Sequence, residues 1–267
     1  MKKLTVFCAA ACLAASAAAQ NHPDLHEVLD RQKGRNLIEI PKGTYTLDVR
    51  SNGPYKFHNL TDVHINGNGS TVICNNQEQA FSFYNCVRVE LRDLTIDYDP
   101  LCFTQGEITA VAEDGSWFDV RIDEGYPVTG LAANRVQFYD PQTRLLKRNS
   151  ITTYTSNYSA LKQLGHNLFR AVKNGTWSAG EQVGDLVVMD VKTDKPNAGV
   201  HTVMPNKCYN TKLENVTVYG SNTFSFFEKE GYANEYRNCV VDRGPMPQCI
   251  RPRLRSGNAD GIHSSQA

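Results

Sequence analysis

The chain has 267 residues, of which 40% are hydrophobic, and its 28 basic and 28 acidic side chains give no formal net charge. This balance excludes a molecule-wide field that would attract nucleic acid or an anionic membrane, so neither is expected as a partner. The length allows one all-β domain or one domain with an insertion. An uncharged ligand such as a neutral glycan suits the charge balance, although the balance does not require one.

The first twenty residues have the features of a bacterial secretory signal peptide. Lys2 and Lys3 form a basic start, residues 4–19 are mostly apolar, and residues 17–19 are alanines suited to cleavage. The stretch is too short and too rich in alanine for a membrane span. We therefore expect residues 1–19 to be removed and the mature protein to be exported to the periplasm, the cell surface or the medium.

Six cysteines remain after this removal, and an even number permits up to three disulfides in an exported protein. They are Cys74, Cys86, Cys102, Cys208, Cys239 and Cys249. No two are spaced as C-x-x-C, so a structural zinc site is not expected, and no cofactor motif is present. We expect most of them to be buried as small apolar side chains in a stacked core, with disulfides as the alternative.

The mature chain is predicted to begin with one short helix and two short strands. Leu25, Val28 and Leu29 have helical spacing and are followed by Gly34, which indicates a short amphipathic helix. Alternating apolar residues on either side of a turn at 41–43 then indicate two strands.

Internal repeats determine the predicted fold. Four stretches share a large apolar residue, a spacer, an Asp or Asn, and then an apolar–x–apolar pattern. They are LTDVHIN from Leu60, LRDLTID from Leu91, LENVTVY from Leu213 and YRNCVVD from Tyr236. This alignment places Leu60 opposite Leu91, and Leu213 opposite Tyr236, on neighbouring coils. A weaker pair, FSFY from Phe81 and FSFF from Phe224, alternates with them along the chain.

Interleaved repeats of this kind are typical of a parallel β-helix. Each coil is too short to bury its own apolar residues, so stacked neighbours supply the core. The shared Asp and Asn positions are expected to stack at a turn, where short polar side chains satisfy backbone groups. These positions are Asp62, Asp93, Asn215 and Asn238. An ordinary β-sandwich with chance similarity is the alternative.

The repeat is interrupted at about 101–205, where the pattern changes to antiparallel hairpins. Asp114-Gly115 lies between two strand-like runs, and Asn174-Gly175 is expected to form a second hairpin turn. We therefore expect an antiparallel β-barrel or sandwich inserted in the β-helix. The insert contains Trp117 and Trp177, for which core packing is the expected role and sugar stacking the alternative.

Several common catalytic motifs are absent. The sequence has no P-loop, no G-x-S-x-G elbow and no H-E-x-x-H metal motif. The predicted organisation is a signal peptide at 1–19, N-terminal coils with a short capping helix at 20–100, an inserted antiparallel β domain at 101–205, and further coils, incomplete at the C-terminus, at 206–267.

The stretch IEIPKGTYTL, the coil repeats and the closing NADG resemble the pectin-lyase-like superfamily, whose fold is a right-handed parallel β-helix. More narrowly, IDYDPLCFTQGEI before the insert and RPRLRSGNADGIHSS after it resemble exported bacterial proteins related to family 110 α-galactosidases. The resemblance covers nearly the whole mature chain. It implies a carbohydrate-active protein whose partner is an oligo- or polysaccharide.

The resemblance gives Asp260 a candidate catalytic role, whereas the residues alone favour an Asx turn. β-Helix glycosidases such as polygalacturonases have an N-[T/A]-D-G motif that contributes one carboxylate, and a D-D pair on the next coil supplies the others. Inverting hydrolysis needs an acid and a base about 6.5–9.5 Å apart, which side chains on coils about 4.8 Å apart can reach. No Asp-Asp pair occurs in this chain, so we expect either a fragment of a longer enzyme or a truncated product.

Four further residues are candidate substrate contacts. His263 follows Asp260 closely enough to face the same side, and Arg253 and Arg255 are placed to hold a hydroxyl or to orient Asp260. Glu228 ends the FSFFE strand one coil earlier and is the nearest candidate carboxylate. Each also has a plainer interpretation, as a surface or core histidine, solvated arginines and an exposed glutamate.

Three functions follow from these residues and the resemblance. An inverting glycoside hydrolase of the α-galactosidase type is the first, and a non-catalytic glycan-binding or surface module is the second. A polysaccharide lyase ranks third because no cluster of acidic calcium ligands is evident. The last coil is also expected to expose strand edges and apolar residues such as Ile262, with fraying after about Gly244.

Overall fold

A computed structural model describes residues 22–191, 201–221, 223–245, 251–254 and 261–266. These residues form two parallel sheets and one antiparallel sheet, and the predicted all-β class is confirmed. Asp260, Arg255 and Cys249 lie outside the described residues.

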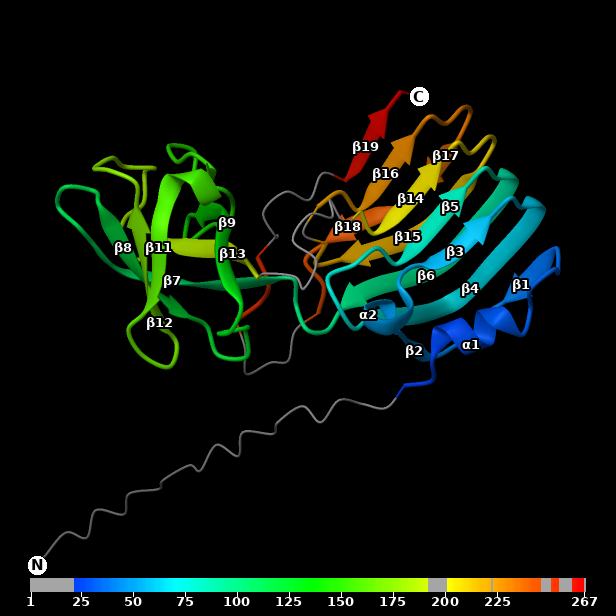
Figure 1. Ribbon diagram of the computed structural model, residues 1–267, viewed down its shortest axis with the longest axis horizontal. Helices are drawn as coiled ribbons and strands as arrows, with labels where there is room; N and C mark the ends of the chain where they lie inside the picture. Colours follow the sequence, from blue (N-terminus) through cyan, green and yellow to red (C-terminus); the bar gives the residue numbers. More distant parts are fainter. Residues whose placement is uncertain (1–21, 192–200, 222, 246–250, 255–260, 267) are drawn as a thin grey trace, which may run out of the picture.

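The chain alternates between the two parallel sheets and adds strands to each in turn (Figure 1). Sheet A contains β1 (Leu37–Glu39), β2 (Thr44–Leu47), β4 (Thr61–Cys74), β6 (Val87–Tyr98), β15 (Lys212–Tyr219), β17 (Glu235–Arg237) and β18 (Val240–Asp242). Sheet B contains β3 (Tyr55–His58), β5 (Phe81–Tyr84), β14 (Val203–Asn206), β16 (Phe226–Lys229) and β19 (Ile262–Ser265). One strand of sheet B and the following strands of sheet A form one coil, and we call the stacked coils the parallel region.

The N-terminal elements agree with the sequence pattern. Helix α1 (Leu25–Asp30) buries Leu25 and Leu29, and the Asp24 carboxylate accepts from the backbone N–H of His26 to cap it. Strands β1 and β2 both form, and each pairs in parallel with β4. A short helix α2 (Val49–Asn52) follows β2.

Residues with left-handed backbone stack in three columns, with φ between 50° and 57°. Some lie between strands and others lie inside β4, β6 and β15. The columns are Asn59, Asn85, Lys207, Glu230 and Gln266; Asp62, Arg88, Asn210 and Ala233; and Asp93, Asn215 and Asn238. Side chains link neighbours within a column: Asn85 donates to Asn59 over 2.8 Å and Asn215 donates to Asp93 over 2.8 Å. The predicted stacking of Asx turns is therefore present.

The alignment of the first repeat pair is wrong. Leu91 pairs with Ile65 rather than lying opposite Leu60, and Asp62 stacks on Arg88 instead of Asp93. The alignment of the last two stretches is correct, because Leu213 pairs with Tyr236.

Apolar side chains from both sheets fill the parallel region. Phe57 stacks on Phe83 with ring centroids 4.9 Å apart, and it also contacts Phe81. These rings are at most 3% exposed, together with Leu91 and Phe226. The stacked strands of the two parallel sheets thus share one core.

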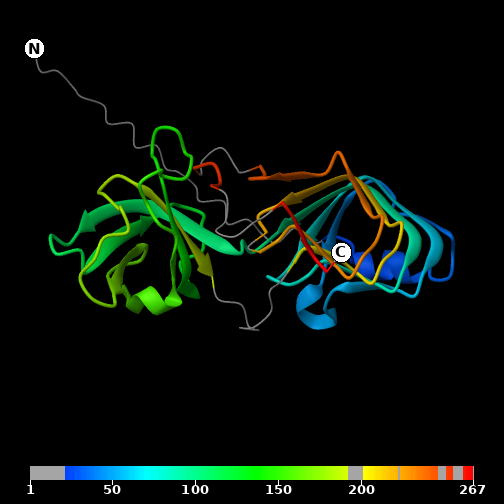
Figure 2. The same cartoon turned by 90° about the horizontal axis from the view of Figure 1, so that it is seen from above.

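The inserted segment folds into a nearly closed antiparallel barrel (Figure 2). The order of its strands in the sheet is β10-β9-β13-β7-β8-β12-β11. Its elements are β7 (Phe103–Val111), β8 (Trp117–Ile122), β9 (Leu131–Tyr139), β10 (Thr153–Tyr154), η1 (Thr155–Asn157), β11 (Tyr158–Gln163), β12 (Leu168–Lys173) and β13 (Leu186–Val191). β11 also contacts β9, which brings the two ends of the sheet together. The hairpin at Asp114-Gly115 is confirmed, whereas Asn174-Gly175 does not join two paired strands.

Residues 251–254 cross from the parallel region to the barrel. The Gln105 amide donates to the carbonyl of Pro252 over 3.1 Å and its oxygen accepts from Leu254 N–H over 2.7 Å. The Tyr126 hydroxyl donates to the carbonyl of Arg251 over 2.8 Å. Leu254 is 1% exposed and packs into the barrel core, so this segment is anchored immediately before residues 255–260.

Two further expectations concern cysteines and membranes. Five cysteines are free thiols, and only Cys239 among them is partly exposed. This agrees with the expected burial. Among the described residues, no helix is long and apolar enough to cross a bilayer.

Candidate functional site

Strand β19 carries His263, one of the three predicted site residues that the structure describes. It pairs in parallel with β16, so that His263 lies beside Phe227 and Ser264 beside Glu228. The N–H of Phe226 donates to the carbonyl of Gly261 over 3.1 Å, which extends the pairing to the residue after Asp260. The chain therefore enters sheet B directly after the NADG motif.

Four rings stack beside this strand and form a cluster that we call the ring stack. They are His201, Phe224, Phe227 and His263. Phe224 lies nearly parallel to both imidazoles, with centroids 4.9 Å from His201 and 4.1 Å from His263. His201 also contacts Phe227 at 4.2 Å. All four side chains are partly exposed, so the ring stack forms a surface at the sheet-B side of three coils.

The environment of His201 keeps its imidazole neutral. Burial, with a smaller effect from His263, lowers the pKa of His201 to about 4. Its Nδ1 atom is buried and has no hydrogen-bond partner among the described residues. A neutral imidazole has one donor and one acceptor nitrogen, so this ring can exchange hydrogen bonds with an uncharged hydroxyl.

Glu228 does not join His263. It follows Phe227 on β16 and therefore faces the other side of the sheet, the side of the buried Phe226. Its carboxylate accepts from the Asn234 amide over 2.8 Å and from the Tyr236 hydroxyl over 3.4 Å. Burial and this carboxylate raise the pKa of Tyr236. Glu228 thus stabilises the interior of the last coils.

Arg253 is also placed inside the protein. It is 8% exposed, and its guanidinium forms an ion pair of 2.7 Å with Asp97 at the end of β6. Asp97 additionally accepts from the backbone N–H of Tyr98. This arrangement holds residues 251–254 against the parallel region. Among the described residues, His263 is the predicted substrate contact that lies at the ring stack.

The two tryptophans lie in the barrel, away from the ring stack. Trp177 packs against the barrel core, and the Lys173 ammonium lies 4.7 Å from its ring centroid. Trp117 is covered by the Arg170 guanidinium at 3.5 Å, which is itself paired with Asp119. Trp177 therefore has the expected role in core packing, whereas Trp117 is part of a surface cation–π contact.

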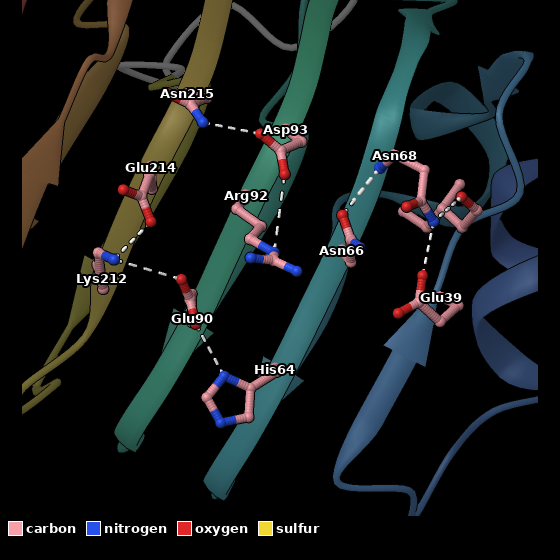
Figure 3. A network of polar contacts seen from close by, with 11 residues as sticks. Glu39, His64, Asn66, Asn68, Glu90, Arg92, Asp93, Lys212, Glu214 and Asn215 are labelled. Carbon is pink, nitrogen blue, oxygen red and sulfur yellow. Dashed lines mark hydrogen bonds and ion pairs between the residues drawn. The ribbon is translucent and has the colours of Figure 1, made fainter.

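A cluster of polar side chains lies along the outer face of sheet A (Figure 3). His64 contacts Glu90 at 2.8 Å, and Lys212 bridges Glu90 and Glu214 at 3.5 Å and 2.5 Å. Lys212 and Glu90 thus pair across neighbouring strands, and His64 extends the contact to a third strand. Such ladders stabilise a sheet by small amounts per pair, and we assign this cluster a structural role.

The comparisons with known proteins add no family. Neither the protein-family models nor the curated proteins with which the chain was compared match it. The described residues contain no group of three or more metal-ligating side chains.

Sequence reasoning misses the rings at His201, Phe224 and Phe227. The FSFF stretch indicates a strand, but its role as a surface depends on the pairing of β14, β16 and β19. His201 and His263 are far apart in the sequence, and only the coil register brings both imidazoles to Phe224.

Proposed function

We propose that the protein is an exported, carbohydrate-active protein of the right-handed parallel β-helix type, and that it binds an oligo- or polysaccharide at the ring stack. The observation that supports this most directly is the stacking of Phe224 between two imidazoles beside the strand that follows NADG. Alternation of the chain between two parallel sheets supports the fold assignment.

The chemistry of the ring stack suits a sugar. The exposed edges of Phe224 and Phe227 offer apolar contact to the C–H groups of a pyranose, while the imidazoles of His201 and His263 offer donors and acceptors to its hydroxyls. The ring stack contains no carboxylate and no permanently charged group, so recognition there favours a neutral glycan.

Hydrolysis is the second candidate function, and it depends on Asp260. This residue precedes Gly261, whose carbonyl accepts from Phe226, and the segment before it is anchored by Leu254. In an inverting mechanism of the α-galactosidase type, the Asp260 carboxylate would act as acid or base, opposite a second carboxylate.

Binding should be measured by calorimetry with neutral galactose-containing oligosaccharides. Phe224→Ala is expected to weaken binding about 10-fold or more, because it removes the ring on which both imidazoles stack. The matched control is Tyr232→Ala, which removes an exposed aromatic side chain elsewhere on the parallel region. Equal affinity of the Phe224 variant and the unmodified protein, with both folded by circular dichroism, would exclude the ring stack as the binding surface.

The same oligosaccharides distinguish binding from hydrolysis. If the chain hydrolyses a glycan, release of reducing sugar should disappear in Asp260→Asn while binding at the ring stack persists. If it only binds, no sugar is released by either protein. Sugar release that survives the Asp260 substitution would contradict the catalytic assignment.

A further inference from the structure

Two buried cysteines occupy equivalent positions on neighbouring coils. Cys86 lies between β5 and β6, and Cys208 lies between β14 and β15. The backbone N–H of Tyr209 donates to the carbonyl of Cys86 over 2.9 Å, and Val87 pairs in parallel with Tyr209. The pairing places the two cysteines side by side, at the separation of neighbouring parallel strands.

Both thiols lie in the core of the parallel region, and both residues are fully buried. The Cys86 thiol donates to the carbonyl of Phe57 over 3.1 Å, and the Cys208 thiol donates to the carbonyl of Asn206 over 3.3 Å. The neighbouring Cys208 lowers the pKa of Cys86, whereas the pKa of Cys208 is raised.

The spacing of the two residues suits a covalent bond. Neighbouring strands lie about 4.8 Å apart, within the roughly 4.4–6.8 Å between Cα atoms that a disulfide spans. Cys239 provides a contrast on the following coil, because the Sγ contacts described for it are the backbone carbonyls of Leu213 and Arg237.

We propose that Cys86 and Cys208 form a disulfide in the exported protein. The oxidant is a low-molecular disulfide such as oxidised glutathione, or the disulfide of a thiol–disulfide oxidoreductase. The Cys86 thiolate attacks one sulfur of the oxidant, which forms a mixed disulfide and releases one thiol. The Cys208 thiolate then attacks the Cys86 sulfur and releases the second thiol, so two cysteines are oxidised and one disulfide is reduced.

This bond would join the coils on either side of the inserted barrel. The closed loop contains about 120 residues, and a loop of that length gives a large reduction in the entropy of the unfolded chain. The bond would therefore fix the register across the insertion and support the coils that carry the ring stack. Because both thiols are buried, the reaction occurs during folding or local opening of the coils.

Peptide mapping of the full chain tests the pairing. The protein is incubated with oxidised glutathione, free thiols are blocked with iodoacetamide under denaturing conditions, and the digest is analysed by mass spectrometry without reduction. We expect a peptide pair joined through Cys86 and Cys208, with Cys74, Cys102 and Cys239 alkylated. Alkylation of both Cys86 and Cys208, or pairing of either with Cys249 or another cysteine, would overturn the proposal.

Thermal unfolding provides a second measurement. The oxidised protein should unfold at a temperature roughly 10 °C above that of the reduced protein. This difference should disappear in Cys86→Ser and in Cys208→Ser but persist in Cys239→Ser, the matched control. An equal response to reductant in all four proteins would contradict the pairing even if one variant were destabilised.

Discussion

The parallel region and the barrel satisfy their turns in different ways. In the parallel region, left-handed turn residues are mostly not glycine, and they recur in columns along the stack. In the barrel, the described positive-φ residues are glycines, such as Gly115 and Gly175, with Arg144 as the exception. Stacked turns can exchange side-chain hydrogen bonds with neighbouring coils, as Asn215 does with Asp93, whereas an isolated turn needs the freedom of glycine.

The two regions also differ in what they bury. The interior of the parallel region is mainly stacked phenylalanine and aliphatic side chains. The barrel buries a complete ion pair, Lys173 with Glu181, and the carboxylate of Asp190. The parallel region also buries Asp97, which pairs with Arg253, and Glu228, which accepts from Asn234. Both regions thus combine apolar burial with charges that depend on their partners, but the ion pair of the barrel is the more completely buried.

Removal of a stacked phenylalanine should give the largest effect. Phe83→Ala leaves a cavity beside Phe57 and is expected to cost about 4 kcal/mol, because the shared core cannot close around it. Both tryptophans of the chain lie in the barrel, so their fluorescence follows the barrel while far-UV circular dichroism follows both regions.

The expected result is a lower dichroism midpoint with little change in tryptophan fluorescence. The matched variant Phe118→Ala in the barrel core should have the opposite pattern. Equal shifts of both signals in both variants would show that the regions unfold as one unit.

Breaking the buried ion pair is expected to have the next largest effect. Lys173→Met leaves the Glu181 carboxylate buried without its cation and should destabilise the barrel by about 3 kcal/mol. Adding Glu181→Leu should recover most of this loss. A small deficit is expected to remain because the N–H of Ala179 loses its acceptor on Glu181, 2.7 Å away. Fluorescence-detected unfolding measures both, and a double variant no more stable than Lys173→Met would refute the ion-pair argument.

Turn substitutions test the contrast in backbone conformation. Asn215→Ala should cost about 1–2 kcal/mol, because alanine disfavours the left-handed region and cannot donate to Asp93. Asn215→Gly should cost less. In the barrel, Gly115→Asn should be more destabilising than either, since a Cβ there would lie 2.7 Å from the carbonyl oxygen of Trp177. Denaturant unfolding of the three variants measures the order, and an undisturbed Gly115→Asn protein would contradict it.

The sequence pattern is sufficient for the parallel strands, for the hairpin at Asp114-Gly115 and for most of the Asx turns, but not for Asn174-Gly175, which joins no paired strands. It is insufficient for the register. The alternating apolar residues around Leu60 can be aligned with Leu60 opposite Leu91, or with Leu60 opposite Cys86 as in the structure, almost equally well. The turn conformation is also adopted by Arg88, Lys207 and Ala233, whose side chains carry no turn signal. Membership of a column is therefore set by stacking and not by residue type.

The site is less predictable than the fold for similar reasons. Strand alternation alone places Glu228 on the same face as Phe226, so its inward direction could have been deduced from FSFFE. The partner of Arg253 could not, because Asp97 is 156 residues away and the contact depends on how residues 251–254 cross to the barrel.

Acid should act in opposite directions on the two regions. The pKa of His201 is about 4 in the folded protein, below its usual value of about 6.5, so the unfolded chain binds the proton first. The stability contributed by the neutral imidazole is present above pH 6.5 and is lost as the pH falls towards 4. His201→Gln should remove this part of the pH dependence from the dichroism midpoint.

The contribution of Asp190 to stability depends on pH in the opposite direction. Burial raises its pKa to about 6 despite the charge of Arg135, so the folded barrel binds the proton before the unfolded chain does. The barrel should gain stability as the pH falls from about 6 to 3.8. Fluorescence-detected unfolding at pH 7 and pH 5 measures this, and Asp190→Asn should remove the gain. Paired carboxylates such as Glu90, whose pKa is lowered, contribute less stability in acid, and they do so in every variant. The difference between each variant and the unmodified protein therefore isolates the contributions of His201 and Asp190. A gain in acid that persists in Asp190→Asn would remove Asp190 as its source.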